Sequence, residues 1–484
     1  MSQTIKFFTL SLLLAAMLAG CGEAAPAVDT TVADTQTTTT AETVILAPDL
    51  PSITYGGAEI RFLTRASTDT VVRYYSEVAS HEQNGETMND STYARTIRLE
   101  EKYNVKFVED RVDDVNDTFS RSFLAGEDNW EVIVSGYQKT AQLAVADNYF
   151  LDLASLPYVD IEKPWWDTRV TTDLSIGGQS LVAVGAINTW TDSHTYAVVF
   201  NKDLAEVQKV DPYAMVDENK WTLDNFAKLL SDVTADIDGN SVMDQNDRYG
   251  AVGEYFNFTV LMNGLGVHTV TKDADDMPVY NVDGRFYDAA EKVWALLRSG
   301  DVLMANDYSS VDKDPWTNVI RKNFRAGNSL FYVGGMEQLL IFRDLDTPIG
   351  LLPMPKADEN ADYAHIFSTT WASVIAVPAS NTREEMTGVL LEAMNADAWQ
   401  STAVDYYDIV IKGKTMRDED SVRMLEIIRA TRTADFEHAF GFLGLTGIYS
   451  GALKGKDSSA LASSVASAID AANTKLSDTL KNFS

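Results

Sequence analysis

An apolar run near the N-terminus indicates the cellular compartment in which the rest of the chain functions. Lys6 supplies a small positive charge, and residues 7–19 form an almost unbroken apolar run. The run is shorter than the ~20 residues that a helix needs to cross a bilayer. Ala19 and Gly20 then supply small residues before Cys21. This order of charge, apolar run and small residues predicts a secretory signal peptide over residues 1–20.

Cys21 is the only cysteine in the chain and directly follows Leu-Ala-Gly. This placement resembles the lipobox of bacterial lipoproteins, in which the cysteine is lipidated and becomes the new N-terminus. The alternative is an ordinary cleaved signal with an incidental cysteine. Since several acyl chains anchor stably, the resemblance implies lipid anchoring on the extracellular face of the bacterial cytoplasmic membrane. With Cys21 lipidated, no thiol remains for a disulfide or for thiol chemistry.

Length and charge narrow the class of protein. The chain has 484 residues, of which 45% are hydrophobic, enough for two or three domains with sizeable cores. Asp and Glu number 71 against 39 Lys and Arg, a formal net charge of −32. Because phosphates repel such a surface, no nucleic-acid partner is expected. Residues 22–50 are rich in Ala, Thr, Pro and acidic residues without periodicity, so with lipidated Cys21 the range 21–50 is predicted to be a disordered tether.

After the tether, strand-like and helix-like segments alternate. Strands are predicted at residues 60–64, 105–108, 130–135, 181–184 and 196–200. Helices are predicted at residues 90–103 and 117–125, after a Thr222 cap, over 286–297, after a Thr382–Glu385 capping box, and from Ser458. This alternation predicts an α/β fold with mainly parallel sheets flanked by helices.

The segment from Asp236 to Asp247 has the spacing of a twelve-residue calcium loop. The candidate ligands are five side-chain oxygens and one backbone carbonyl, from Asp236, Asp238, Asn240, Val242 (carbonyl), Asp244 and Asp247. Two positions depart from the EF-hand pattern: Ser241 replaces the usual Gly, and Asp247 replaces a bidentate Glu. The loop resembles the Asp-ended loops of dockerin modules. It predicts a structural Ca²⁺ site, with a solvated acidic turn as the alternative.

The common catalytic motifs are missing from the sequence. There is no H-E-x-x-H, no G-x-S-x-G and no G-x-x-x-x-G-K-[ST], and the five histidines are scattered. The sequence therefore predicts a protein that is not an enzyme. A carboxylate pair for glycoside hydrolysis stays open, because 71 acidic residues leave many possible pairs.

Aromatic residues occur in several loops that follow predicted strands. Since sugars present flat apolar C–H faces, such rings stack on them while polar side chains bind the hydroxyls. The alternative for each ring is packing in the core or between lobes. The candidates are Tyr137, Trp190, Tyr255, Phe256, Tyr332 and Trp371.

Several short sequence motifs together indicate a family resemblance. They are Asn84–Asp90, Asp152-Leu153, Pro164–Asp167, Phe200–Leu204, Lys220–Asp224, the Asp236 loop with Arg248–Gly250, Leu352–Lys356 and Arg417–Glu419. From about Tyr55 to Phe440, the chain resembles the extracellular solute-binding lipoproteins of ABC importers, in the carbohydrate-binding branch that includes maltose-binding protein. The resemblance implies two α/β lobes that close on a ligand.

The resemblance also implies a division of the chain. Lobe one is expected at residues 52–188 plus 368–400, and lobe two at 189–367 plus 401–484. Crossings between lobes are expected near residues 184–190 and 366–374, with a third after the Thr382 helix.

Positions that match ligand contacts of the family include both aromatic and polar residues. They are Arg65, Tyr137, Trp190, Asp192, Glu254, Tyr255, Phe256, Tyr332, Met336 and Trp371. Met336 departs from the aromatic residue that sugar-binding relatives often carry, so the identity of the ligand stays open.

The resemblance implies a monomeric receptor that captures a small solute, a mono- or oligosaccharide, and delivers it to an ABC permease in the membrane. Two other classes stay open: an extracellular carbohydrate-active hydrolase, and a surface adhesion or scaffold lipoprotein. Among receptors, peptides or other solutes could replace the sugar.

Overall fold

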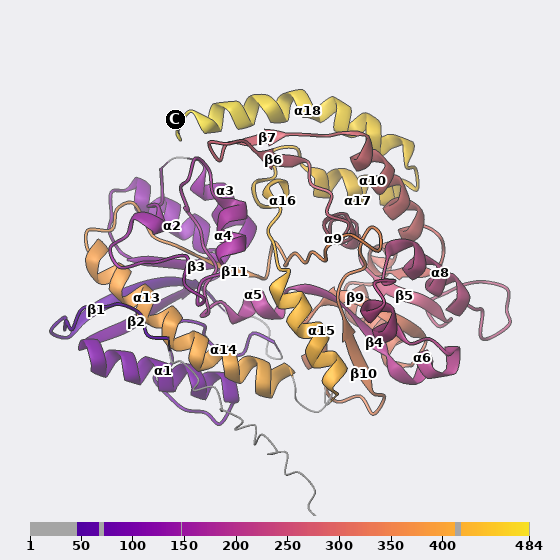
Figure 1. The fold of residues 1–484 in the computed structure, drawn as a ribbon, viewed down its shortest axis with the longest axis horizontal. Helices are drawn as coiled ribbons and strands as arrows, with labels where there is room; N and C mark the ends of the chain where they lie inside the picture. The colour runs from indigo at the N-terminus through magenta and orange to yellow at the C-terminus, as the bar shows by residue number, and fades with distance from the viewer. Residues whose placement is uncertain (1–45, 67–71, 147, 412–417, 484) are drawn as a thin grey trace, which may run out of the picture. The chain divides into compact units, whose positions relative to one another are not determined.

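Two separate β-sheets organise the chain (Figure 1). The computed structural model describes residues 46–66, 72–146, 148–411 and 418–483. The predicted signal peptide, Cys21 and nearly all of the predicted tether lie outside the described residues. Residues 47–484 form one unit, and everything below concerns that unit. No helix of the described part is long and apolar enough to span a membrane.

The sheet of lobe one has the strand order β11-β3-β1-β2. β1 (Ala58–Arg65) pairs in parallel with β2 (Val105–Val112) and β3 (Val132–Gly136), and β11 (Ser373–Ala376) runs antiparallel to β3. The helices of this lobe are α1 (Thr87–Tyr103), α2 (Val115–Leu124), α3 (Tyr137–Ala144), α4 (Thr168–Leu174), α13 (Glu384–Gln400) and α14 (Thr402–Asp405), with a 3₁₀ turn at Leu153–Ser155.

The sheet of lobe two has the order β10-β4-β9-β5-β8. Its strands are β4 (Tyr196–Asn201), β5 (Tyr249–Gly253), β8 (Val302–Met304), β9 (Ser329–Gly335) and β10 (Ile349–Leu352). β5 pairs in parallel with β8 and β9, whereas β4 runs antiparallel to β9 and β10. The predicted α/β class with two sheet-based lobes is therefore confirmed, and the second sheet is mixed.

Helices also surround the second sheet. They are α6 (Lys202–Gln208), α7 (Pro212–Asp217), α8 (Leu223–Val233), α9 (Asn257–Gly264), α10 (Gly284–Leu297), α11 (Lys322–Arg325), α12 (Glu337–Ile341), α15 (Glu419–Ala430) and α17 (Leu445–Gly455). Shorter turns lie at Ala305–Tyr308 (3₁₀) and at Trp316–Arg321 and Tyr406–Ile411 (both π-helical).

Local sequence explains most of these elements. In α8 the Thr222 hydroxyl accepts a hydrogen bond from the backbone N–H of Asn225 at 3.4 Å, as the predicted cap requires. The buried residues of α8 recur at helical spacing, at Leu223, Phe226, Leu230 and Val233. β1 buries Ile60 and Phe62 in one cluster and Leu63 in another, because successive side chains point to opposite faces.

Two local predictions are wrong. α13 begins at Glu384, and its N-cap residue Arg383 makes no capping hydrogen bond with its side chain. The Thr382 hydroxyl donates instead to Asp128 at 3.0 Å, so a tertiary contact replaces the expected capping box. Residues 181–184 do not form a strand of either sheet, and Ala183 makes only an isolated bridge to Ile375.

Several segments join the lobes. Helix α5 (Thr189–Ser193) leads from lobe one into β4, and residues 366–372 lead back to β11. The predicted division assigned residues 401–484 wholly to lobe two. The structure instead packs α14 on α1, and α16 (Phe436–Phe440) on α3 and α4 of lobe one.

A hairpin and the last helix also reach from lobe two to lobe one. β6 (Val270–Lys272) and β7 (Pro278–Tyr280) lie beside α18 (Ser459–Leu480) at the top of Figure 1. Lys272 Nζ donates to the carbonyls of Thr172 and Ser175 at 2.5 and 2.6 Å. In α18, Leu461 packs in the core of lobe two and Leu476 in that of lobe one. This double contact ties the lobes together away from α5.

Candidate functional site

A cavity of about 450 Å³ lies against the ends of β4, β5 and β9 and the segment that leads into β11. This volume is in the range of ligand pockets. Its walls combine aromatic, acidic, basic and hydroxyl groups. The lining residues are His194, Tyr196, Glu254, Phe256, Trp316, Ile320, Arg321, Tyr332, Val333, Gly334, Gly335, Glu337, Gln338, Ser368, Thr369, Thr370 and Trp371.

Glu254, directly after β5, organises the acidic side of the cavity. One carboxylate oxygen accepts a hydrogen bond from the Tyr196 hydroxyl at 3.0 Å, and the other accepts from Trp316 Nε1 at 2.7 Å. Burial raises the pKa of Tyr196 well above its ordinary value, which keeps this hydroxyl a donor. The Glu254 carboxylate thus holds two aromatic side chains from β4 and the Trp316–Arg321 turn in the cavity wall.

A second carboxyl, Glu337, lies at the start of α12. Burial raises its pKa to about 7. Its neighbour Gln338 donates to it at 2.8 Å and accepts from Arg321 Nε at 3.1 Å. A Cβ at Gly335 would overlap the Glu337 carboxyl, so a side chain there would displace this carboxyl from its place in the wall. The cavity therefore offers acceptors, amide and guanidinium donors and aromatic faces, the set that binds hydroxyl-rich rings.

Four of the ten predicted ligand residues line this cavity: Glu254, Phe256, Tyr332 and Trp371. Arg65 lies next to them, since its guanidinium donates to the Thr370 carbonyl at 2.6 Å and stacks 4.3 Å from the Trp371 ring centre. The guanidinium of Arg73 stacks on the same ring at 3.6 Å. These stacked cations hold the partly exposed Trp371 in place.

The other five predicted ligand residues lie outside the wall of this cavity. Tyr137 packs on Phe367 with ring centres 4.7 Å apart, and Trp190 packs on Tyr75 at 6.4 Å. Tyr255 donates to Asp307 at 2.5 Å. Met336 is buried in the core of lobe two, and Asp192 is ion-paired with Arg432. Their side chains support the folded framework around the cavity.

Sequence reasoning missed several cavity residues. Glu337 and Gln338 directly follow the Gly334-Gly335-Met336 segment, and Ser368–Thr370 directly precede Trp371. Their position next to a predicted ligand residue was the only sequence feature that pointed to them. Trp316 and Arg321 belong to a π-helical turn that does not follow a predicted strand, so the predictions at strand ends did not include them. Tyr196 was hidden inside an apolar strand that reads as core.

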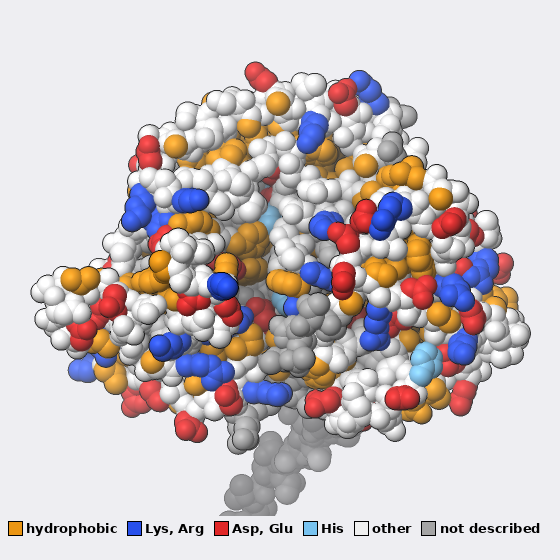
Figure 2. Space-filling view, turned by 180° about the vertical axis from the view of Figure 1, so that it is seen from behind, with side chains coloured by type: hydrophobic (Ala, Val, Ile, Leu, Met, Phe, Trp, Pro, Cys, Tyr) orange, Lys and Arg blue, Asp and Glu red, His pale blue; other side chains and the backbone are white. Residues whose placement is uncertain are grey.

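A smaller cavity of about 210 Å³ continues on the lobe-one side. It shares Thr369 and Thr370 with the first cavity, and its walls are polar, from Arg65, Asp113, Asp114, Asn116, Ser135, Gln138 and Lys139. Figure 2 shows the face of the molecule opposite Figure 1, where Lys and Arg side chains are interspersed with Asp and Glu.

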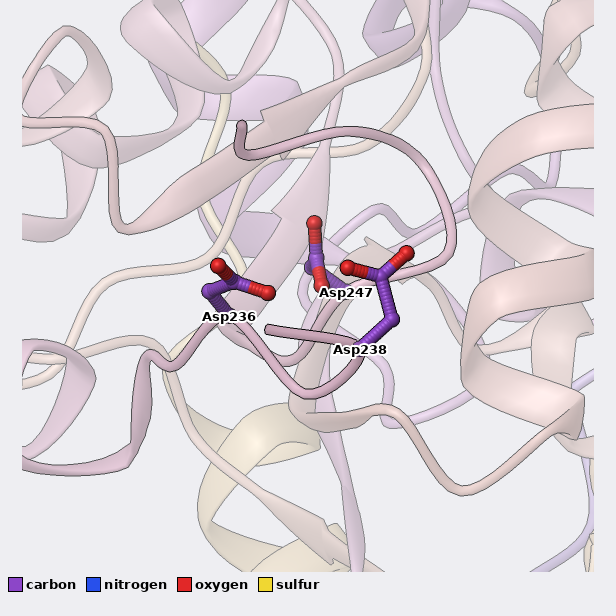
Figure 3. A group of neighbouring side chains, drawn as sticks. All are labelled: Asp236, Asp238 and Asp247. Carbon is purple, nitrogen blue, oxygen red and sulfur yellow. The ribbon is translucent and has the colours of Figure 1, made fainter. Parts of the chain in front are cut away.

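The loop predicted to bind calcium gathers three of its carboxylates. Oxygens of Asp236, Asp238 and Asp247 lie within 4.8 Å of one another, and Figure 3 shows the three side chains facing a common space. Asp236 accepts from the N–H groups of Gly239 and Ser241, both at 2.7 Å.

Ser241 has the backbone conformation that glycine usually adopts at this position of a calcium loop. Its φ of +66° lies in the left-handed region, where the standard loop carries glycine. The hydrogen bond from Ser241 lowers the pKa of Asp236. Asn240 accepts from the N–H of Val242, and Asp244 from that of Asn246, both at 2.7 Å. These bonds shape the loop, and the calcium site stays a prediction.

At the junction of the lobes, Arg432 joins three segments. Its Nε donates to Asp167, the N-cap residue of α4, at 2.7 Å, and its terminal nitrogen donates to Asp192 in α5. The side chains of Arg432, Asp167 and Asp192 are only 14%, 14% and 10% exposed. A guanidinium shared by two carboxylates with so little water is strongly held in place.

Solved structures share this fold. An ABC substrate-binding protein from Listeria monocytogenes in complex with cycloalternan aligns with a TM-score of 0.55 and 14% identity, over 87% of this chain and 99% of that chain. A sugar transporter protein from Rhizobium etli, in an open conformation, aligns with a TM-score of 0.56 and 14% identity over 88% and 99%. A receptor from Streptomyces glaucescens, solved without ligand and with acarbose, aligns at 0.53 and 13% over 86% and 99%. No protein-family model and no curated protein matches the sequence.

Replacing Arg432 should destabilise the protein strongly. In Arg432→Met, the carboxylates of Asp167 and Asp192 stay buried without their cation, which should lower the free energy of unfolding by about 3–5 kcal/mol. Urea unfolding measures this change. Arg423→Met is the matched control, because Arg423 pairs with Asp217 at the surface, and it should cost less than about 1 kcal/mol. Equal losses in the two variants would contradict the role of Arg432.

Proposed function

We propose that this chain is a receptor that captures a saccharide in the cavity beside β4, β5 and β9. The single observation that carries the proposal is the cavity wall itself, where Glu254 holds Trp316 and Tyr196 beside Glu337, Gln338 and Arg321. Aromatic faces and hydrogen-bonding side chains of this kind match the C–H faces and hydroxyls of a sugar ring. The shared fold with sugar-binding receptors adds support.

The size of the site favours an oligosaccharide over a single sugar ring. The cavities of about 450 and 210 Å³ have Thr369 and Thr370 in common, so a ligand that extends from one cavity into the other passes these two hydroxyl side chains. In this proposal Thr369 and Thr370 lie between neighbouring sugar rings, and Lys139 and Asp114 contact the lobe-one end of the ligand.

The receptor is proposed to deliver its ligand to the transmembrane subunits of an ABC importer. A two-lobe protein that closes on its ligand differs in shape between the empty and loaded states, and a permease that prefers the closed form thereby selects loaded receptor. An extracellular carbohydrate-active hydrolase is the second candidate, because two carboxyls, Glu254 and Glu337, line one cavity.

The first experiment separates receptor from hydrolase. Residues 47–484 are titrated by calorimetry with maltotriose, maltotetraose, acarbose and cycloalternan, and each mixture is then analysed for products. Saturable one-to-one binding with an unchanged glycan is expected. Trp316→Ala should weaken that binding by about tenfold or more, which is about 1.4 kcal/mol.

The control for this variant is Trp294→Ala. Trp294 is a half-buried tryptophan of the same lobe that donates to the Ala452 carbonyl and does not line the cavity. Its replacement should leave glycan affinity unchanged. Equal affinity in wild type and Trp316→Ala would reject the proposed site, and a cleaved glycan would favour the hydrolase.

The receptor is further proposed to be a lipoprotein, anchored through Cys21 on the outer side of the cytoplasmic membrane. In the Cys21→Ser variant no acyl chain can be attached, so the protein should move from the membrane fraction to the medium or a soluble fraction. Phase partition in a detergent that clouds on warming measures the change. A variant that stays with the detergent as wild type does would contradict lipidation at this residue.

We also propose that the Asp236–Asp247 loop binds Ca²⁺ as a structural ion. Binding to the folded state alone stabilises it, by about 2.7 kcal/mol at a hundredfold excess over Kd. The melting temperature should therefore fall in EDTA, recover with Ca²⁺ and recover less with Mg²⁺, which demands tighter octahedral geometry. Asp238→Asn should remove most of the response. A melt that is the same in EDTA and Ca²⁺ would reject the site.

A further inference from the structure

Helix α9 carries three polar side chains outside the wall of the cavity proposed for sugar, of which Asn257 is hydrogen-bonded to the backbone of Glu254 and Val333. All eight residues of this helix are buried, and the apolar side chains among them are Phe258, Val260, Leu261 and Met262. Thr259 and Asn263 stand four residues apart and therefore share one face of the helix. They are 9% and 2% exposed, and burying hydroxyl and amide groups this deeply is unfavourable without hydrogen bonds.

This face of α9 looks into a small space of about 20 Å³. Thr269, before β6, and His438, in α16, line the same space and are 2% and 4% exposed. Six polar atoms of these four side chains have no hydrogen-bond partner among the residues that the structure describes. They are Thr259 Oγ1, Asn263 Oδ1 and Nδ2, Thr269 Oγ1, and His438 Nδ1 and Nε2.

Such a concentration of unpaired groups requires an explanation. Nearly all buried polar atoms in folded proteins are paired with protein or with ordered water, and each unpaired one is destabilising. Six unpaired atoms around one space indicate an occupant that hydrogen-bonds to several of them at once.

The mixture of donors and acceptors selects the occupant. Burial lowers the pKa of His438 to about 4, so at neutral pH its ring is uncharged and offers one N–H donor and one acceptor. The Asn263 amide likewise offers both. A bare metal ion accepts no hydrogen bonds, and a fully deprotonated anion donates none. A small neutral molecule that both donates and accepts satisfies the set.

The nearby carboxylates also argue against an ion. Asp435 already accepts from the His268 ring at 2.9 Å and from the backbone N–H of His438 at 2.8 Å. Glu437 accepts from the Tyr280 hydroxyl at 2.5 Å and from the N–H of Gly444 at 2.7 Å. These oxygens are engaged, and their negative charge repels an anion.

We propose that this space is a buried hydration site, in which one or two ordered waters join α9 to Thr269 and His438. A water needs about 10–15 Å³ of such volume and makes about three hydrogen bonds, so the space fits this number. The site lies behind the proposed sugar cavity, because the His438 ring packs 4.9 Å from that of Phe256 in the cavity wall. The carbonyl of His438 accepts from Gln138 of α3, so the waters join lobe two to a segment held by lobe one.

The sign of a stability change tests this proposal without any sugar. Thr259→Val and Thr269→Val keep the side-chain shape and remove one hydroxyl each. With water present, each variant loses a water-mediated hydrogen bond, and the melting temperature should fall by about 1–3 °C. With a dry space, each variant removes an unpaired buried hydroxyl, and the melting temperature should stay equal or rise.

The control is Thr474→Val, because the Thr474 hydroxyl lies at the surface of α18 and donates to the Asp470 carbonyl. This variant should melt within about 1 °C of wild type. A high-resolution crystal structure should also show density within hydrogen-bond distance of the Thr269 hydroxyl and of one His438 nitrogen. An empty space in that structure, or valine variants that melt as high as wild type, would overturn the proposal.

Discussion

The ion pairs of Arg432 are the constraint on which the arrangement of this protein depends. One guanidinium holds the N-cap residue of α4 in lobe one and a residue of α5, the helix that leads into β4. Because all three charges are nearly buried, moving one segment without the others would strand a charge away from water. The start of β4 and the position of Tyr196 in the cavity wall therefore follow from a contact outside the cavity.

A similar logic holds within the cavity. Glu254 uses both carboxylate oxygens to hold Tyr196 and Trp316, which come from different parts of the chain. The protein itself thus holds the rings in place, and for the proposed receptor such preorganisation reduces the entropy lost on binding. Phe256 extends the same wall and packs on His438, so the wall rests on the polar space behind α9.

The lobes are joined at more than the hinge segments. The β6–β7 hairpin places Lys272 on backbone carbonyls of lobe one, and α18 buries Leu461 in one core and Leu476 in the other. A hinge motion that moves the lobes apart at these contacts must break them or slide along them. A hinge motion that preserves the contacts must use them as its pivot. Their strength therefore contributes to how far the cavity walls can move apart.

Local rules account for what the sequence determined by itself. The α/β class, the strands near residues 60–64 and 196–200, the Thr222 cap and the Asp236 loop follow from hydrophobic periodicity and short-range hydrogen bonds, which depend on neighbours in the chain. Predicted ligand residues such as Glu254 and Trp371 reached the cavity wall because they follow strand ends or lead into them. Only the tertiary structure decided that Trp190 and Met336 pack away from the wall while Trp316 joins it. The reason is physical: an aromatic or sulfur-containing side chain is equally suited to core and to ligand, and the packing of distant segments determines which surface it meets.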